Sequence, residues 1–467
     1  MARHRFPDGF LWGVATSAQQ IEGGRDAGGR GESIWDRFAA TPGRIADGSN
    51  PDVACDHYHR WREDVAIMRR LGLGAYRFSI AWPRVLPAGT GRPNAAGLDF
   101  YDALVDGLLA AGIEPFPTLY HWDLPQALQD GGGWAERDTA RAFAEYAGVV
   151  VRRLGDRVAR WTTHNEPWCA ATLGHEEGHH APGHTDPAEA LRAAHHLLLS
   201  HGWAAAAIRN EAPAAEVGIV LIHSPAHPAT GGAADADAAR WFDGFFNRWY
   251  LDPVFRGAYP ADAVADRIAA GHLADAEPPY VRDGDMAAIA APLDFLGLNY
   301  YSRVVMKAGP DGRPVAENPA PPGERTDMDW EVFPRGLYES LTRIHRDYAP
   351  RRIYVTENGA AYDDPADAAG RIADGRRIAY LRDHLLAARR AIAEGVPLAG
   401  YFAWSLMDNF EWGYGYTKRF GLFAVEDETQ RRVPRDSAFW YHDLVSANAV
   451  DDSPAPTSHG DSHAFDP

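Results

Sequence analysis

Two stretches of this chain decide its fold, because each is a short β-rich run that ends in a glutamate: Trp161-Thr162-Thr163-His164-Asn165-Glu166-Pro167 and Ile353-Tyr354-Val355-Thr356-Glu357-Asn358-Gly359. A Pro or a Gly stops each run, so each glutamate is expected at the C-terminal end of a strand. Glu166 and Glu357 lie far apart in the sequence. Only a closed fold could bring the two carboxylates face to face.

Six further β-rich runs complete a regular alternation of strands with amphipathic helices. The eight candidate strands are residues 10–15, 75–80, 114–120, 159–163, 217–222, 295–298, 353–356 and 398–405. Between them apolar residues recur at helical spacing, as at Leu98, Tyr101, Leu104, Val105 and Leu108. The pattern predicts an α/β fold, a single (β/α)8 TIM barrel with elaborated loops after its strands. We expect the barrel to span residues 1–447 and the polar, Pro-rich residues 448–467 to form a disordered tail.

The composition is that of an ordinary globular protein, since 46% of the 467 residues are hydrophobic and 24% are charged. The net charge of −18 at pH 7 argues against a nucleic-acid partner, because phosphate binding needs clustered Lys and Arg. The first residues carry no apolar signal segment, and no run approaches the ~18 apolar residues of a membrane helix. We therefore expect a cytoplasmic protein without a membrane partner, and the sequence does not indicate its oligomeric state.

Polar or aromatic residues follow every candidate strand. In chain order they are Gln20, Arg77, His121, Asn165 with Glu166, His223, Tyr300, Glu357 and Trp404. Because the C-terminal face of such a barrel carries its chemistry, these side chains are expected to converge on one pocket. Their hydrogen-bonding groups and one flat apolar ring suit a polyhydroxylated ligand. Two glutamates presented in this way suit the cleavage of a glycosidic bond by one acid and one nucleophile.

Seven motifs, in order along the chain, resemble those of glycoside hydrolase family 1, the β-glucosidase family. They are residues 10–23, 76–84, 121–125, 165–168, 298–301, 356–359 and 404–412. The first departs from the family pattern at Gln19, where the family more often carries an aromatic residue or His. That departure affects the packing of a neighbour and leaves Gln20 in place. Seven motifs in the family's order are too many for coincidence, and the resemblance covers nearly the whole chain.

The resemblance implies roles for the two glutamates. Glu166 would be the acid/base and Glu357 the nucleophile of a retaining mechanism that passes through a covalent glycosyl-enzyme, with carboxyl groups about 5–5.5 Å apart. Their surroundings must therefore keep Glu357 ionised while Glu166 waits protonated. Arg77, Asn299 and Tyr300 would support the nucleophile. Arg77 would favour its charged form, and Tyr300 would donate a hydrogen bond to it.

The same resemblance implies a sugar pocket made of polar groups and aromatic rings. Trp404 would stack under the ring, Trp122 would form a wall, and Trp168 and Trp330 would lie at the mouth, where the aglycone binds. The residues that would bind the sugar hydroxyls or otherwise contact the substrate are Gln20, His121, Asn165, Tyr300, Glu411 and Trp412. No cofactor is expected.

The implied reaction is hydrolysis of terminal, non-reducing β-D-glucosyl residues of O-glucosides and cello-oligosaccharides. Glu411 would repel a phosphate, which favours an unphosphorylated sugar, and Glu166 argues for O-glycosides because thioglucoside-cleaving relatives carry Gln there. A β-galactosidase or β-fucosidase preference on the same residues stays open as an alternative. A non-catalytic sugar-binding barrel is a second alternative, because a fold alone does not give a function.

Two features could point to other chemistry. The run His175-Glu176-Glu177-Gly178-His179 matches the HExxH zinc pattern, which requires a helix to bring both imidazoles to one face. Gly178 interrupts it and His180-Ala181-Pro182-Gly183 follows, so we expect a loop and no metal. Of the two cysteines, Cys55 and Cys169, the second follows Glu166 closely and is interpreted as a small apolar residue beside the site.

Overall fold

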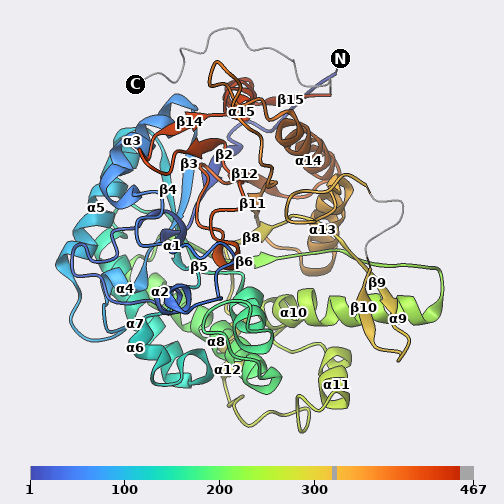
Figure 1. The fold of residues 1–467 in the computed structure, drawn as a ribbon. Coiled ribbons are helices and arrows are strands. Elements are labelled where there is room, and N and C mark those ends of the chain that lie inside the picture. Colours follow the sequence, from blue (N-terminus) through green and yellow to red (C-terminus); the bar gives the residue numbers. More distant parts are fainter. Residues whose placement is uncertain (1, 318–322, 453–467) are drawn as a thin grey trace.

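Eight parallel strands close into a barrel, which confirms the predicted fold class. The structure, a computed structural model, describes residues 2–317 and 323–452, and Figure 1 shows the helices surrounding the strands. The barrel order is β11-β12-β2-β3-β4-β5-β6-β8. Its strands are β2 (Leu11–Ala15), β3 (Ala75–Ser79), β4 (Glu114–Tyr120), β5 (Arg160–Asn165), β6 (Glu216–Ile222), β8 (Phe295–Asn299), β11 (Ile353–Asn358) and β12 (Leu398–Trp404).

All eight predicted strands are present, and the differences lie at their ends. β5 and β11 run two residues further than predicted, so Asn165 and Glu357 belong to the strands themselves. Both extensions follow a shift in register, between Thr162 and Asn165 on β5 and between Val355 and Asn358 on β11. A shift in register changes the direction of the last side chains of a strand. The alternation of apolar residues in the sequence does not show such a shift.

The helices that cover the barrel follow the apolar periodicity of the sequence. In α5 (Ala95–Ala110), for example, Tyr101, Leu104, Val105 and Leu108 are buried. The other helices are α1 (Ala18–Ile21), α2 (Ile34–Ala40), α3 (His57–Arg70), α4 (Trp82–Val85), α6 (Gln126–Gln129), α7 (Arg137–Leu154), α8 (Pro187–Glu211), α9 (Ala233–Phe242), α10 (Trp249–Arg256), α11 (Ala261–Ala269), α12 (Asp285–Ile289), α13 (Pro334–Tyr348), α14 (Gly375–Ala393) and α15 (Asp436–Ala447).

Aromatic rings fill the inside of the barrel. The Phe116 ring centroid lies 5.4 Å from that of Phe295, 5.3 Å from that of Tyr354 and 5.2 Å from that of Phe402. A β-carbon at Gly13 would meet the Phe402 ring at 2.4 Å, so this strand position needs glycine. The packed rings support the C-terminal ends of the strands, where the polar side chains lie.

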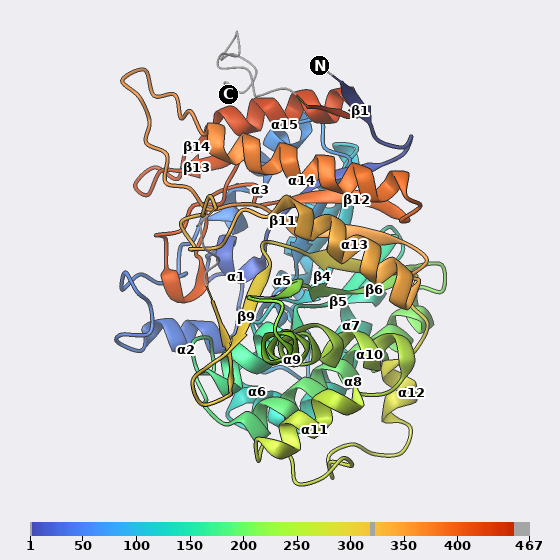
Figure 2. The same cartoon turned by 90° about the vertical axis from the view of Figure 1, so that its right-hand side faces the viewer.

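Elaborated loops follow several strands at that end. A π-helix, η2 (Cys169–Glu176), follows β5, and a second one, η3 (Asp243–Arg248), continues α9. β7 (Ala226–Pro228), β9 (Val304–Ala308) and β10 (Pro314–Ala316) form a small sheet, and β7 and β9 pack on α9. In Figure 2 β9 and α9 lie at the front of the molecule, outside the barrel strands.

The two ends of the described chain pair with each other. β1 (Arg3–Arg5) runs antiparallel to β15 (Ala449–Asp451), so the first residues of the expected tail are part of the fold. Residues 453–467 of that tail lie outside the described residues. The other short elements are β13 (Phe423–Val425), β14 (Arg432–Pro434), η1 (Gly133–Ala135) and η4 (Trp412–Tyr414). Among the described residues, no helix is both long and apolar enough to cross a membrane.

Candidate active site

One cavity of about 890 Å³ opens at the C-terminal ends of the barrel strands. Both Glu166 and Glu357 line it, although they come from opposite halves of the chain. The other predicted site residues on its wall are His121, Trp122, Trp168, Trp330, Trp404, Glu411 and Trp412. The closed barrel therefore brings most of the predicted site together, and further predicted residues lie buried directly behind the wall.

Glu357 has a hydrogen-bond donor on each carboxylate oxygen. Arg77 Nη1 donates to Oε1 at 2.5 Å, and the Tyr301 hydroxyl donates to Oε2 at 2.6 Å. Arg77 is fully buried and Glu357 is nearly so. A buried guanidinium at this distance stabilises the ionised carboxylate, and two donors fix its orientation.

Glu166 has weaker partners. Asn299 Nδ2 donates to its Oε1 at 2.6 Å, and the Cys169 thiol donates to its Oε2 at 3.0 Å. Burial and the nearby charge of Glu357 raise the pKa of Glu166 to about 7. The two carboxyls thus share one cavity, but only Glu357 has a cation bonded to it.

The backbone at Glu166 is held in a left-handed conformation, with φ of 46°. This region costs a residue with a β-carbon about 1 kcal/mol or more. Trp122 and Trp412, which also line the cavity, have φ of 75° and 50°. Surrounding packing must offset this cost at all three positions, which keeps their side chains directed at the cavity.

The prediction that Tyr300 binds the nucleophile was wrong. Its hydroxyl donates to the backbone oxygen of Phe333 at 2.6 Å, on the outside of the barrel. Tyr301, the next residue, makes the contact with Glu357. Side chains alternate between the two sides of a strand, so Asn299 and Tyr301 face inward while Tyr300 faces outward. Tyr300 does not line the cavity, so its predicted role in substrate binding was also wrong.

Asn165 connects the two carboxyl groups through a buried hydrogen-bond network. Its Oδ1 accepts from Arg77 Nη2 at 2.7 Å and from Asn299 Nδ2 at 3.0 Å. Its Nδ2 donates to His121 Nε2 at 3.1 Å. Burial and the charge of Arg77 hold the pKa of His121 well below its usual range, so the ring is neutral. The buried His121 Nδ1 has no hydrogen-bond partner among the described residues and is left to donate to a ligand.

Glu411 is a third carboxyl on the cavity wall. Burial and the charges of Glu357 and Glu166 raise the pKa of Glu411 to about 8. Gln20 lies behind it, with its Nε2 at 3.5 Å from the carboxylate and 2.9 Å from the backbone oxygen of Phe410. Gln20 is fully buried and is not part of the cavity wall, so its clearest contacts fix the Glu411 segment.

Several aromatic rings also line the cavity. Trp412 lies 4.6 Å from Trp122 between ring centroids, and the His121 ring is stacked against both Trp404 and Trp412. Trp168 packs on Phe246, with the ring centroids 4.3 Å apart. Flat faces beside paired carboxyls suit a sugar, whose C–H groups pack on rings while its hydroxyls bind polar groups.

Comparison with known proteins identifies the family. A model of glycosyl hydrolase family 1 matches residues 2–450. The chain belongs to glycosyl hydrolase family 1. It is 47% identical over 449 residues to β-glucosidase A of Thermotoga maritima, covering 96% of this chain and 99% of that protein. It is 48% identical over 451 residues to β-glucosidase A of Acetivibrio thermocellus, covering 96% and 100%.

A solved structure of the family agrees with the fold. The family 1 β-glucosidase from Thermotoga maritima in complex with isofagomine lactam matches with a TM-score of 0.92 at 47% identity. The match covers 96% of this chain and 100% of that chain. The chain is therefore a retaining glycoside hydrolase, and the resemblance drawn from its motifs is confirmed.

Sequence reasoning missed several residues of this family 1 site. Tyr301 could have been found from strand alternation once Asn299 was placed inward. Cys169 was interpreted as an apolar neighbour, but its thiol is a donor to Glu166. Burial and the Glu166 carboxylate raise the pKa of the Cys169 thiol well above its usual range, so it acts as a donor and not as a nucleophile. Phe246 and Phe420 also line the cavity, and no sequence signal marked them.

The HExxH-like stretch places its two histidines in different surroundings. His175 and Glu176 end the π-helix η2, so the prediction of a loop was wrong for these two residues. His175 is buried and contacts Glu189, whereas His179 is 75% exposed and contacts Glu177. The two histidines therefore have different partners and different environments.

Proposed function

We propose that Glu357 is the nucleophile and Glu166 the acid/base in the hydrolysis of β-D-glucosides. The observation that carries this assignment is the unequal environment of two carboxyls on one cavity. Arg77 and Tyr301 bond both oxygens of Glu357. Within residues 2–317 and 323–452 no cation is bonded to Glu166, and its pKa is raised to about 7 by burial and by Glu357. One group is thus kept ionised and the other can carry a proton at neutral pH.

The two steps follow from these states. Glu357 attacks the anomeric carbon while Glu166 gives its proton to the departing glycosidic oxygen, and a covalent glycosyl-enzyme forms. Esterification removes the charge of Glu357, which is one of the causes that raise the pKa of Glu166. The pKa of Glu166 then falls, and its carboxylate takes a proton from the water that cleaves the ester.

Glucose is the sugar that we propose, as a terminal β-linked residue of O-glucosides and cello-oligosaccharides. The names of the relatives, β-glucosidase A in two organisms, support this choice over galactose or fucose. Glu411 and His121 provide an acceptor and a donor for the sugar hydroxyls at the cavity wall. The charge of Glu357, which helps to raise the pKa of Glu411 to about 8, disfavours a phosphorylated sugar beside these carboxyls.

Trp168 and Trp330 are proposed to contact the aglycone. Both line the cavity, and Trp330 packs against Tyr301 with ring centroids 5.2 Å apart. Apolar rings at the mouth accept varied leaving groups, which fits cello-oligosaccharides and aryl glucosides alike. A cytoplasmic location stays a prediction from the sequence, which cell fractionation would test.

A panel of p-nitrophenyl β-glycosides with cellobiose tests the substrate assignment. We expect kcat/KM to be highest for the β-glucoside among the aryl glycosides. The same panel run on Glu357→Ala separates catalysis from binding. This variant is expected to lose hydrolysis and to form the α-glycosyl azide when azide is added, because the anion enters the space left by the carboxylate. Near wild-type turnover in Glu357→Ala would contradict the nucleophile assignment.

A further inference from the structure

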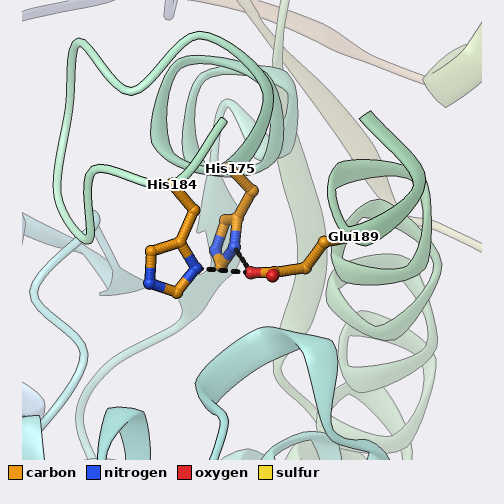
Figure 3. A group of neighbouring side chains, drawn as sticks. All are labelled: His175, His184 and Glu189. Carbon is orange, nitrogen blue, oxygen red and sulfur yellow. Dashed lines mark hydrogen bonds and ion pairs between the residues drawn. The ribbon is translucent and has the colours of Figure 1, made fainter. Parts of the chain in front are cut away.

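Three side chains outside the active-site cavity meet in a group that the reaction does not use. His175 ends η2, His184 lies in the loop that follows, and Glu189 stands in the first turn of α8. Figure 3 shows both imidazole rings directed at one carboxylate. His175 Nδ1 and His184 Nδ1 each lie 2.6 Å from the same oxygen, Oε1 of Glu189. One ligand atom from each residue lies within 4.8 Å of the others.

The residue types and their convergence fit a transition-metal ion. Two imidazole nitrogens and one carboxylate oxygen are a common set of Zn²⁺ ligands, with a fourth position left for water. Zn–N distances near 2.0–2.1 Å require the ligand atoms of a tetrahedral site to be roughly 3.3 Å apart. The present 2.6 Å contacts must therefore open by less than about 1 Å to admit the ion. Ca²⁺ and Mg²⁺ prefer sets made of oxygen ligands and fit poorly.

The surroundings allow this adjustment. The His175 side chain is 1% exposed and gives a fixed ligand, whereas the His184 side chain is 44% exposed and faces solvent. The Glu189 side chain is 18% exposed, and its acceptor oxygen already lies between the two rings. His175 is therefore a fixed ligand, and the more exposed His184 and Glu189 can move to let the ion enter.

We propose that His175, His184 and Glu189 bind one Zn²⁺ ion. On binding, each imidazole coordinates the ion through Nδ1 in its neutral form, with its proton on Nε2, and any excess proton is released to solvent. It joins the end of η2 to the start of α8. η2 also begins with Cys169, whose thiol contacts Glu166, so the ion stabilises the segment that follows the proposed acid/base. The three ligands are not part of the cavity wall, so the ion contributes stability and takes no part in the reaction.

Thermal unfolding of the untagged, EDTA-treated enzyme with added Zn²⁺ tests this proposal. We expect Tm to rise by about 2–5 °C when free Zn²⁺ is a hundredfold above its Kd, and Mg²⁺ to have no effect. Calorimetric titration should give one Zn²⁺ per chain, and Co²⁺ should give the visible absorption of a tetrahedral site. EDTA treatment should leave kcat unchanged, because the site is outside the cavity.

The chain offers two test variants and a matched control. His184→Ala and Glu189→Gln should abolish the Tm rise, and His184 is exposed enough that its loss leaves the fold intact. His179→Ala removes another exposed histidine of the same loop, four residues after His175, and should keep the full rise. The absence of a Zn²⁺ effect in the wild type would show a hydrogen-bonded cluster and overturn the proposal. So would an unchanged effect in His184→Ala, or its loss in His179→Ala.

Discussion

Replacing Tyr301 by Phe removes one hydroxyl from the site and leaves the ring in place. That hydroxyl donates to Glu357 Oε2 at 2.6 Å, and Arg77 keeps the other oxygen. A hydrogen bond to a charged group contributes about 1.5–3 kcal/mol. At 1.36 kcal/mol for each factor of ten, its loss corresponds to about a 10- to 150-fold fall in kcat/KM. The donor positions the carboxylate and stabilises its negative charge in the buried cavity, so we expect a decrease.

Tyr300→Phe is the matched control, because it is the same substitution one residue away. Its hydroxyl donates to the backbone oxygen of Phe333 and not to Glu357. Losing this neutral hydrogen bond should lower the free energy of unfolding by about 0.5–1.5 kcal/mol and leave kcat/KM close to the wild-type value. The assay is kcat/KM for p-nitrophenyl β-glucoside, together with urea unfolding of both variants. A larger loss of kcat/KM in Tyr300→Phe than in Tyr301→Phe would refute the reasoning.

Four further predictions concern the charged groups of the cavity and the substrate that they select. The pKa of Glu166 is raised to about 7, and the acid must be protonated in the first step. Therefore kcat/KM should fall as pH rises through about 7. The hydrogen bond from Cys169 lowers the pKa of Glu166, so Cys169→Ala should raise this pKa and move the fall in kcat/KM to higher pH. Glu166→Ala should slow the hydrolysis of substrates with poor leaving groups far more than that of aryl glucosides. Measuring kcat/KM for a series of leaving groups tests this, and equal losses across the series would argue against Glu166 as the acid/base. Glu411→Ala should lower kcat more than it raises KM, since contacts to hydroxyls tighten as the ring distorts. Wild-type enzyme should also prefer p-nitrophenyl β-glucoside to its 6-phosphate, and the reverse preference would overturn the substrate assignment.

The barrel and the two glutamates could be predicted because their signals are local. A β-rich run followed by Pro or Gly marks the end of a strand, and the C-terminal ends of parallel strands meet at one face. Glu166 and Glu357 could thus be placed on one cavity without knowledge of any contact. Arg77, inside its strand, could be paired with Glu357 by the same argument.

Contacts that depend on side-chain direction were harder to predict. The resemblance assigned the contact with Glu357 to Tyr300, although strand alternation directs Tyr300 outward and Tyr301 inward. The contact of Cys169 with Glu166 depends on a π-helical turn, which the spacing of apolar residues in the sequence does not predict. The meeting of His184 with Glu189 depends on how a loop returns to α8, which the spacing of His175 and His179 did not reveal.

The central claim is that Glu357 forms a covalent bond with the sugar. It is tested most directly by incubating the enzyme with an activated 2-deoxy-2-fluoro-β-glucoside, which slows the second step more than the first. Intact mass and peptide mapping then locate the trapped sugar. The account predicts one fluoroglucosyl group per chain, attached to the peptide that contains Glu357 and absent from Glu357→Ala. A sugar attached to Glu166, or hydrolysis of ordinary substrates with inversion and no trapped sugar, would contradict it.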